Sequence, residues 1–409
     1  MELRPILSAM RRNKVGAFLI GIQMAITLAI LCNALFIIEQ RLAWSKRPTG
    51  LDEPNVFAVT NQWVGDPKDL KSKLLTDLAA MRAVPGVVDV TASNSYPLSD
   101  GGSTEGVKLN AEQRDDAAIT ALYIADEHGL AAMGLKLVAG RNFSVEEVSD
   151  KAGFDDGVPP AAIIVTRALA DKLFPGGNAL GQSIYVHYQK HQVPIVGIVD
   201  RLQVPWTTAG GWGSTFSNNA VVEPFRNEAP YVHYIVRAKP GQIAAVMKAV
   251  EKRLFEVSRM RVLPTIRAQS ETRVLAYKDD HGLAVILGVV CGALLAVTAF
   301  GIVGLTSYWV AQRSRQIGIR RALGATRNAI VSYFQTENFL IAAAGAIVGV
   351  ALAMALNLWM MSFFATERLN GGYALVGAVM VLLLGQAAAL WPALKAASIP
   401  PALATRGSI

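Results

Sequence analysis

The stretch that decides the fold is Arg313-Ser-Arg-Gln-Ile-Gly-Ile-Arg-Arg-Ala-Leu-Gly-Ala-Thr-Arg327, which lies between two long uncharged segments. Its five arginines cannot lie in hydrocarbon, so the stretch must lie at a membrane face. Short arginine-rich loops stay on the cytoplasmic side during insertion, and this rule orients both flanking spans. The stretch therefore predicts a membrane protein with this loop in the cytoplasm.

Apolar residues are interleaved with these arginines. Ile317, Ile319, Leu323 and Ile330 occupy the intervening positions, and no proline interrupts residues 316–325. The pattern predicts a short amphipathic helix along the cytoplasmic face. It has two interpretations, a positive-inside anchor or a docking surface for a cytoplasmic partner.

The remaining apolar runs predict four membrane spans with both termini in the cytoplasm. The first run, 15–38, is too long for a signal-peptide core and is followed by no small-x-small cleavage site. The second, 282–312, is free of charged residues, and a helix of that length would be roughly 46 Å long against a hydrocarbon core of about 30 Å. It is therefore expected to project beyond the membrane as a stalk.

The region 39–281 shows the same order of strand, helix and strand at its two ends. These βαβ halves, at about 52–94 and 229–270, predict a split α+β domain that closes by pairing distant parts of the chain. The insertion between them, at about 95–228, is rich in turn residues and short strand-like runs. We expect it to be mostly β.

The formal net charge of +8 arises beside the apolar runs. Acidic and basic residues nearly balance within 39–281, whereas basic residues predominate in 1–14 and in the arginine-rich stretch. Charge placed in this way orients a membrane protein, so nucleic acid is not an expected partner. The two cysteines, Cys32 and Cys291, fall inside apolar runs, which excludes disulfides and cysteine metal sites from 39–281.

Signals for catalysis are weak. Residues 176–183 nearly match a phosphate-binding loop, but Gln182 stands where the chemistry needs lysine, and the segment follows a predicted helix. His187 and His191 flank a predicted hairpin turn and form no zinc signature. No nucleophile–base set is recognisable. We expect no enzyme activity, no cofactor and no metal, with any ATPase on a separate chain.

Two features of the spans have alternative interpretations. The pairs Gly288-x-x-x-Gly292 and Gly345-x-x-x-Gly349 allow close helix contact, either within one subunit or between two. Glu337 is the one charged residue of the third apolar run, about ten residues past Arg327. It pairs with an arginine near the cytoplasmic interface, or it serves as a proton or substrate relay.

The segment Arg315-Gln-Ile-Gly-Ile-Arg-Arg-Ala-Leu-Gly-Ala-Thr326 resembles the signature of MacB/FtsX-type ABC transporter permeases. In that family a short cytoplasmic helix between the second and third spans fits into the ATPase subunit, and the pattern usually has Glu where this chain has Gln316. Segments 133–143 and 170–199 resemble the family's periplasmic core domain. The resemblance implies ATPase-coupling roles for Arg315, Gln316, Ile317, Gly318, Ile319, Arg320, Arg321, Leu323 and Gly324.

The expected fold is an α-helical membrane protein with four transmembrane helices and a large α+β periplasmic domain. That domain is a split βαβ porter-like subdomain with an inserted, mostly-β subdomain. The expected order is a cytoplasmic segment at 1–14, spans at 15–38, 282–312, 329–358 and 372–392, the periplasmic domain at 39–281, the coupling segment at 313–328, a periplasmic loop at 359–371 and a cytoplasmic tail at 393–409.

The resemblance implies an inner-membrane permease that couples ATP hydrolysis on a partner to a periplasmic conformational change, or mechanotransmission. Its substrate would be an antibiotic, a peptide, a lipid-linked molecule or a lipoprotein. The implied partners are an ABC ATPase dimer, a second permease (identical or homologous), membrane lipid and, in an efflux assembly, a periplasmic adaptor and an outer-membrane channel. The alternatives are an FtsX-like regulator of cell-wall hydrolases and an antimicrobial-peptide sensor.

Overall fold

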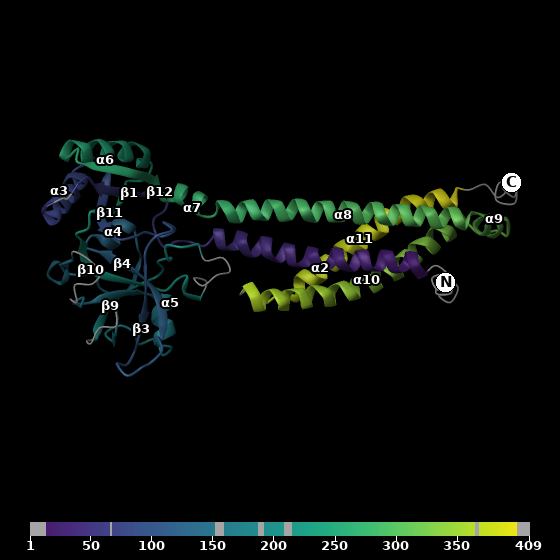
Figure 1. The fold of residues 1–409 in the computed structure, drawn as a ribbon, viewed down its shortest axis with the longest axis horizontal. Helices are drawn as coiled ribbons and strands as arrows, with labels where there is room; N and C mark the ends of the chain where they lie inside the picture. The colour runs from purple at the N-terminus through teal and green to yellow at the C-terminus, as the bar shows by residue number, and fades with distance from the viewer. Residues whose placement is uncertain are drawn as a thin grey trace. The chain divides into compact units, whose positions relative to one another are not determined.

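The computed structural model describes residues 14–65, 68–151, 159–186, 192–207, 215–364 and 368–398. The predictions for residues 1–13, for His187 and His191, and for the tail beyond Ser398 lie outside the described residues. The chain divides into two compact units, a helical one (Met1–Ala43 with Asp280–Ile409) and a mixed one (Trp44–Asp279). Figure 1 shows the elements of both.

The helical unit contains helices α2 (Lys14–Ser45), α8 (Lys278–Gln312), α10 (Arg327–Phe364) and α11 (Gly371–Ala397), with the short α9 (Ser314–Ala322). In the described part of the chain these four long helices are apolar enough to cross a membrane. Their ends extend past the uncharged runs, because a helix needs only its own backbone hydrogen bonds to continue into the polar interface.

Helix α2 is the most enclosed of the four, and α8 is the most exposed. Ile20, Met24 and Leu28 of α2 are fully buried, and they pack in one cluster with side chains of α8, α10 and α11, including Ile302, Ala346 and Val381. Because lipid chains are as apolar as these residues, close packing rather than exclusion of water holds the helices together.

Polar side chains in the spans link neighbouring helices. The hydroxyls of Thr27 and Thr298 lie 2.8 Å apart and join α2 to α8. Asn33 donates to the carbonyl of Ala353 at 3.1 Å and joins α2 to α10, and Asn338 donates to the carbonyl of Gly385 at 2.8 Å and joins α10 to α11. These buried polar groups therefore contribute to helix association.

The mixed unit contains the predicted split subdomain. Its four-stranded sheet has the order β12-β1-β11-β2, so the strands of the two βαβ halves interleave, and every neighbouring pair is antiparallel. Phe57 and Tyr234 of the sheet and Val250 of α6 belong to a core between the sheet and its two helices. The elements are β1 (Val56–Trp63), α3 (Leu70–Arg82), β2 (Val87–Ser93), β11 (Tyr231–Ala238), α6 (Ile243–Val257) and β12 (Arg261–Ala268).

A buried ion pair connects α3 to β12 in this subdomain. Both side chains are fully buried, and Arg261 donates from two nitrogens to the Asp77 carboxylate at 2.8 Å each. Tyr234 donates to the same carboxylate at 2.6 Å, and the guanidinium lies 4.2 Å from the ring centre of Trp63. The carboxylate thus has three donors, which offset the cost of burying its charge.

The insertion forms a mixed, mostly-β subdomain with the strand order β3-β4-β10-β7-β9-β5, while β6 pairs with β10 and β8 with β9. One apolar core, which includes Tyr123 and Ile235, lies between it and the split sheet, and a second lies under α5. The elements are β3 (Ser103–Val107), β4 (Ala118–Ala125), α4 (Gly129–Met133), β5 (Leu137–Gly140), η1 (Val145–Glu147), β6 (Ser149–Lys151), β7 (Ile163–Thr166), α5 (Arg167–Leu173), β8 (Ser183–Ile184), β9 (Val193–Val199) and β10 (Ala220–Asn227).

An ion pair also joins the segment that leads into the mixed unit to the segment that leads out of it. Arg273 of α7 (Gln269–Ala276) donates to both carboxylate oxygens of Glu53, at 2.9 and 2.5 Å, and to the carbonyl of Ser45 at 2.6 Å. Burial raises the pKa of Glu53, but hydrogen bonds from Arg273 and Thr49 outweigh burial, so the pKa lies below its ordinary value. Glu53 therefore stays ionised at neutral pH.

Candidate functional site

Two local signals in the arginine-rich stretch specify where α9 ends and α10 begins. Gly324 has a φ of +96°, a backbone conformation that suits glycine, and its N–H donates to the carbonyl of Arg321 at 3.1 Å. The hydroxyl of Thr326 then accepts from the N–H of Ala329 at 3.2 Å and caps the start of α10. The turn between α9 and α10 is therefore specified by residues 324–326.

The two sides of α9 differ in exposure. Ile317 is 4 % exposed and packs with Val310, Ile330, Phe334 and alanines of α11. Leu323 is 83 % exposed and Ile319 is 45 % exposed. Arg315, Gln316 and Arg320 are also exposed, while Arg321 is partly buried. One side of α9 thus belongs to the core of the helical unit, and the other presents apolar and cationic groups to its surroundings.

This division changes the expected docking face. The resemblance implies coupling roles for both Ile317 and Leu323, but Ile317 and the adjacent Gly318 are buried against the chain's own helices. The sequence pattern could not separate them, because the period of a single short helix does not show which side its neighbours cover. The exposed face consists of Arg315, Gln316, Ile319, Arg320 and Leu323.

Glu337 of α10 forms an ion pair with Arg313, the residue just before α9. One guanidinium nitrogen of Arg313 lies 3.1 and 2.8 Å from the two carboxylate oxygens, and the side chains are 15 % and 4 % exposed respectively. A carboxylate as buried as that of Glu337 needs such a partner, because an unpaired carboxylate in apolar surroundings is strongly disfavoured. The pair holds the beginning of α9 against α10.

Arg320 makes a second contact between α9 and α10. Its guanidinium carbon lies 5.0 Å from the ring centre of Tyr333, within the range of a cation–π interaction. Together with the Arg313–Glu337 pair and the burial of Ile317, this contact makes α9 a fixed projection of the helical unit.

The two glycine pairs have different surroundings. A Cβ at Gly345 would lie 2.7 Å from the carbonyl oxygen of Gly21, and one at Gly349 would lie 2.9 Å from that of Ala25, so this pair serves the contact of α10 with α2. At Gly288 and Gly292 of α8, a Cβ would have no atom of a neighbouring described element within 4 Å. Gly288 and Gly292 therefore lie on an open face of α8.

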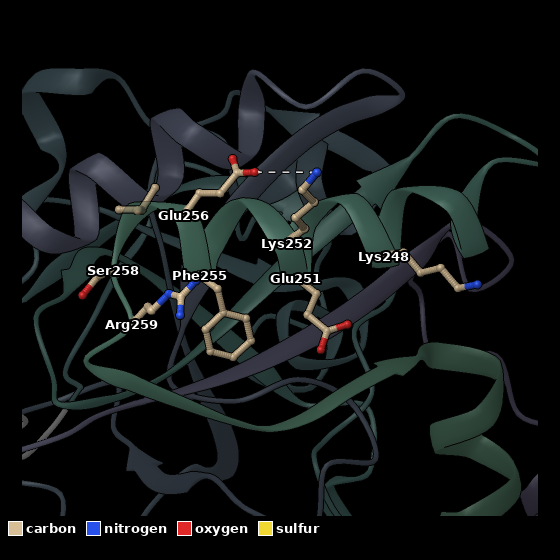
Figure 2. A pocket seen from close by; sticks show the side chains of 8 residues that line it. Lys248, Glu251, Lys252, Phe255, Glu256, Ser258 and Arg259 are labelled. Atoms are coloured by element: carbon tan, nitrogen blue, oxygen red, sulfur yellow. Dashed lines mark ion pairs between the residues drawn. The ribbon is translucent and has the colours of Figure 1, made fainter.

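Other candidate sites are weaker. Residues 176–183 form a turn between α5 and β8, and a phosphate-binding loop would instead run from a strand into a helix. Among the described residues no group of three or more His, Cys, Asp or Glu side chains could hold a metal ion. A shallow hollow of about 770 Å³ runs along the solvent side of α6, where Figure 2 shows Lys252 paired with Glu256. Its charged side chains are those of an ordinary solvated helix.

Two family models match the chain. The model of the MacB-like periplasmic core domain covers residues 18–253. The model of the FtsX-like permease C-terminal region covers residues 288–401, which includes α9 and the exposed face described above.

The chain is also similar to several individual proteins. The chain is 23 % identical over 351 residues to the macrolide export ATP-binding/permease protein MacB of Neisseria meningitidis, covering 82 % of this chain but only 50 % of that protein. It is 23 % identical to the uncharacterized ABC transporter permease YknZ of Bacillus subtilis, over 81 % of this chain and 78 % of that one. The extracellular domain of YknZ from Gram-positive bacteria, a solved structure, has 16 % identity and a TM-score of 0.32, covering 51 % of this chain and 100 % of that domain. The chain spans about half the length of the curated MacB relatives that it matches.

Proposed function

Because the chain belongs to the family that joins a MacB-like periplasmic core domain to an FtsX-like permease region, we propose that it is the membrane subunit of an ATP-driven transporter. It is a multi-pass inner-membrane protein with a periplasmic domain. In our proposal ATP is hydrolysed by a separate ABC ATPase, and both termini of this chain and α9 lie in the cytoplasm. The substrate is an antibiotic, a peptide, a lipid-linked molecule or a lipoprotein.

The observation that carries this proposal is the exposed face of α9. Leu323 is 83 % exposed on a helix that an ion pair, a cation–π contact and a buried isoleucine hold in place. A fixed helix that presents leucine and isoleucine beside arginines has the composition of a binding surface, since arginine is enriched among the residues that dominate interface energetics and burial of exposed apolar side chains favours association. A pure charge anchor needs neither the exposed leucine nor the fixed geometry.

Mechanotransmission is the mechanism that the spans favour. The buried polar groups Thr27, Thr298, Asn33 and Asn338 hydrogen-bond between helices, so they serve helix association rather than a polar path for a substrate. In this mechanism the ATPases move α9, the helical unit transmits the motion, and the periplasmic domain does the work on the substrate.

A second permease completes the proposed assembly. Helix α8 is the least enclosed span, and Gly288 and Gly292 leave one of its faces open to close approach by another helix. The partner is a second copy of this chain or a homologue. An efflux assembly would add a periplasmic adaptor and an outer-membrane channel.

The test is to replace Leu323 or Ile319 by Asp and to measure the ATPase that copurifies from native membranes, together with ATP hydrolysis in nanodiscs. A carboxylate placed in an apolar contact costs several kcal/mol unless it is paired. We expect both changes to reduce ATPase association while membrane insertion is unchanged. Val145→Asp, at a 58 % exposed position of the mixed unit, is the matched control and should behave as wild type.

Wild-type association and hydrolysis in the Leu323→Asp chain would leave α9 as an anchor and remove the main support for the proposal. The copurified partner also separates the alternatives. A cell-wall hydrolase recovered in place of transporter components would favour the FtsX-like regulator, and a sensor kinase would favour the antimicrobial-peptide sensor.

A further inference from the structure

A cavity of about 320 Å³ lies inside the mixed unit, where the loop that leads into the insertion meets the end of the split sheet. This volume is at the lower end of the range for small-molecule sites, about 300–1,000 Å³. No part of the proposed function uses this cavity. Its lining is mostly polar and consists of Tyr96, Leu98, Ser99, Asp100, Pro205, Thr207, Arg267, Thr272, Leu275, Ala276 and Asp279.

The loop at the rim of the cavity is held in an unusual backbone conformation. Leu98 and Asp100 have φ values of 65° and 61°, which non-glycine residues rarely adopt. The side chain of Gln269 donates to the carbonyl of Pro97 at 2.8 Å, and the N–H of Asp100 donates to the carbonyl of Pro205 at 3.0 Å. These bonds fix Asp100 at the rim, and backbone strain of this kind often marks binding sites.

Three charged groups line the cavity, namely Asp100, Asp279 and Arg267. Arg267 is partly buried, yet within the described ranges none of the three belongs to an ion pair with another side chain. This contrasts with Arg261, Arg273 and Arg313, each of which has a carboxylate partner. Asp100 and Asp279 are exposed and Arg267 is partly buried, so the cavity opens to solvent and presents two negative charges and one positive charge, none of them in an ion pair with another described side chain.

The floor of the cavity adds neutral hydroxyl groups. Burial raises the pKa of Tyr96, so its hydroxyl keeps its proton at neutral pH. Tyr96 packs edge-on against His233 with the ring centres 5.2 Å apart, and burial lowers the pKa of His233 to about 4. His233 is thus uncharged at neutral pH, and the charge balance of the cavity is set by its two aspartates and one arginine.

We propose that this cavity binds a free basic amino acid. Its carboxylate would pair with Arg267, and its two ammonium groups would pair with Asp100 and Asp279, so that each of the three charged groups of the cavity receives one partner of opposite charge. Tyr96 and Thr272 line the buried end of the cavity, where the Thr272 hydroxyl donates to the carbonyl of Ala268 at 3.2 Å. An amino acid without a charged side chain, or a diamine without a carboxylate, leaves at least one of the three charged groups unpaired.

The site is joined to a membrane helix by the chain itself. Leu275 and Ala276 belong to α7, and Asp279 is the second residue of α8. Binding in this cavity does not depend on the proposed transport function.

The experiment is calorimetric titration of the purified full chain in detergent at pH 7 with L-lysine, L-norleucine and cadaverine, in the absence of any ATPase. L-lysine should bind, and the other two should bind at least about tenfold more weakly, since each lacks one charge-assisted contact. Asp100→Asn, Asp279→Asn and Arg267→Gln should each weaken L-lysine binding by about tenfold or more.

The matched controls are Glu251→Gln and Arg259→Gln, which remove the same kinds of charge from the hollow along α6 in Figure 2. Both should bind L-lysine as wild type does, and thermal melting of every variant checks that it is folded. The proposal is overturned if wild type does not bind L-lysine at millimolar concentration, if norleucine or cadaverine binds equally well, or if the α6 controls lose binding to the same extent.

Discussion

The Asp77–Arg261 pair shows how much a single buried contact can contribute to this fold. Both side chains are fully buried, and residues 184 positions apart are brought together. Removal of one partner of such a pair typically costs about 3–5 kcal/mol, because the other charge is left buried and uncompensated. Local sequence patterns do not indicate this contact, since neither residue lies near the other along the chain.

We therefore predict that Arg261→Met lowers the free energy of unfolding by about 3–5 kcal/mol. The double variant Asp77→Asn with Arg261→Met should recover a large part of that loss, since it leaves no buried charge. The measurement is denaturant unfolding followed by tryptophan fluorescence, with Arg259→Met, at a nearby exposed arginine, as the control. Additive effects of the two changes would show that the pair is not coupled.

His233 predicts a pH dependence of stability. Burial lowers its pKa from 6.5 to about 4, so the unfolded chain takes up a proton at a higher pH than the folded chain does. Because the unfolded state then binds more protons, stability falls as the pH drops from about 6.5 towards 4. Between pH 7 and pH 5 this residue alone should lower the free energy of unfolding by about 2 kcal/mol.

The corresponding variant is His233→Gln, which should flatten the stability profile between pH 7 and pH 5. His281→Gln, at an exposed position, should keep the wild-type slope. Denaturant unfolding at several pH values measures both. Equal slopes for wild type and His233→Gln would contradict the argument.

At the scale of elements, the helices of the membrane unit differ in how closely they approach one another. A Cβ added at Gly345 would meet the backbone of α2 at 2.7 Å, a distance that forces the helices apart. We predict that Gly345→Ala lowers the melting temperature of the full chain in detergent. Gly304→Ala, in α8, should leave it unchanged or raise it slightly, because no atom of a neighbouring described element lies within 4 Å and alanine favours a helix by up to about 1 kcal/mol over glycine.

The existence of most elements could be predicted from local sequence. Leu70, Leu74 and Leu78 repeat at helical spacing and form one side of α3, and the alternation at Tyr231–Val236 lies in β11. The strand order could not be predicted in the same way, because β1 lies between β11 and β12, far from both in the chain. The same limit applies to α9, where burial of Ile317 depends on side chains of α8, α10 and α11.

The candidate sites, like the strand order, could be predicted from the sequence only in part. The arginine-rich segment could be found from composition alone, since five arginines between apolar runs are conspicuous. Which of its residues are exposed, and that Arg313 pairs with Glu337, required the packing of α9 on α10. The cavity around Arg267 gave no sequence signal, because its charged residues come from separate segments.

At the scale of the whole molecule, the proposed orientation can be measured with single cysteines in a background that lacks Cys32 and Cys291. Ser72→Cys lies at an exposed position of α3, and Ala322→Cys at an exposed position of α9. In spheroplasts an impermeant thiol reagent should label the first directly and the second only after permeabilisation. Direct labelling of Ala322→Cys would reverse the orientation.

The order of the split sheet has a mechanical consequence. The chain enters the mixed unit at Trp44, ahead of β1, and leaves it at Asp279, after β12 and α7. Strands β1 and β12 are antiparallel neighbours in which Phe57 is paired with Ala268. A force that separated the two attachment points would break the hydrogen bonds one at a time, as a zipper opens. A force on both points together would move the sheet without loading that ladder. The Arg273–Glu53 ion pair joins the two segments ahead of this ladder, so it must break before the strands can separate. A force on both attachment points together loads neither the ion pair nor the ladder.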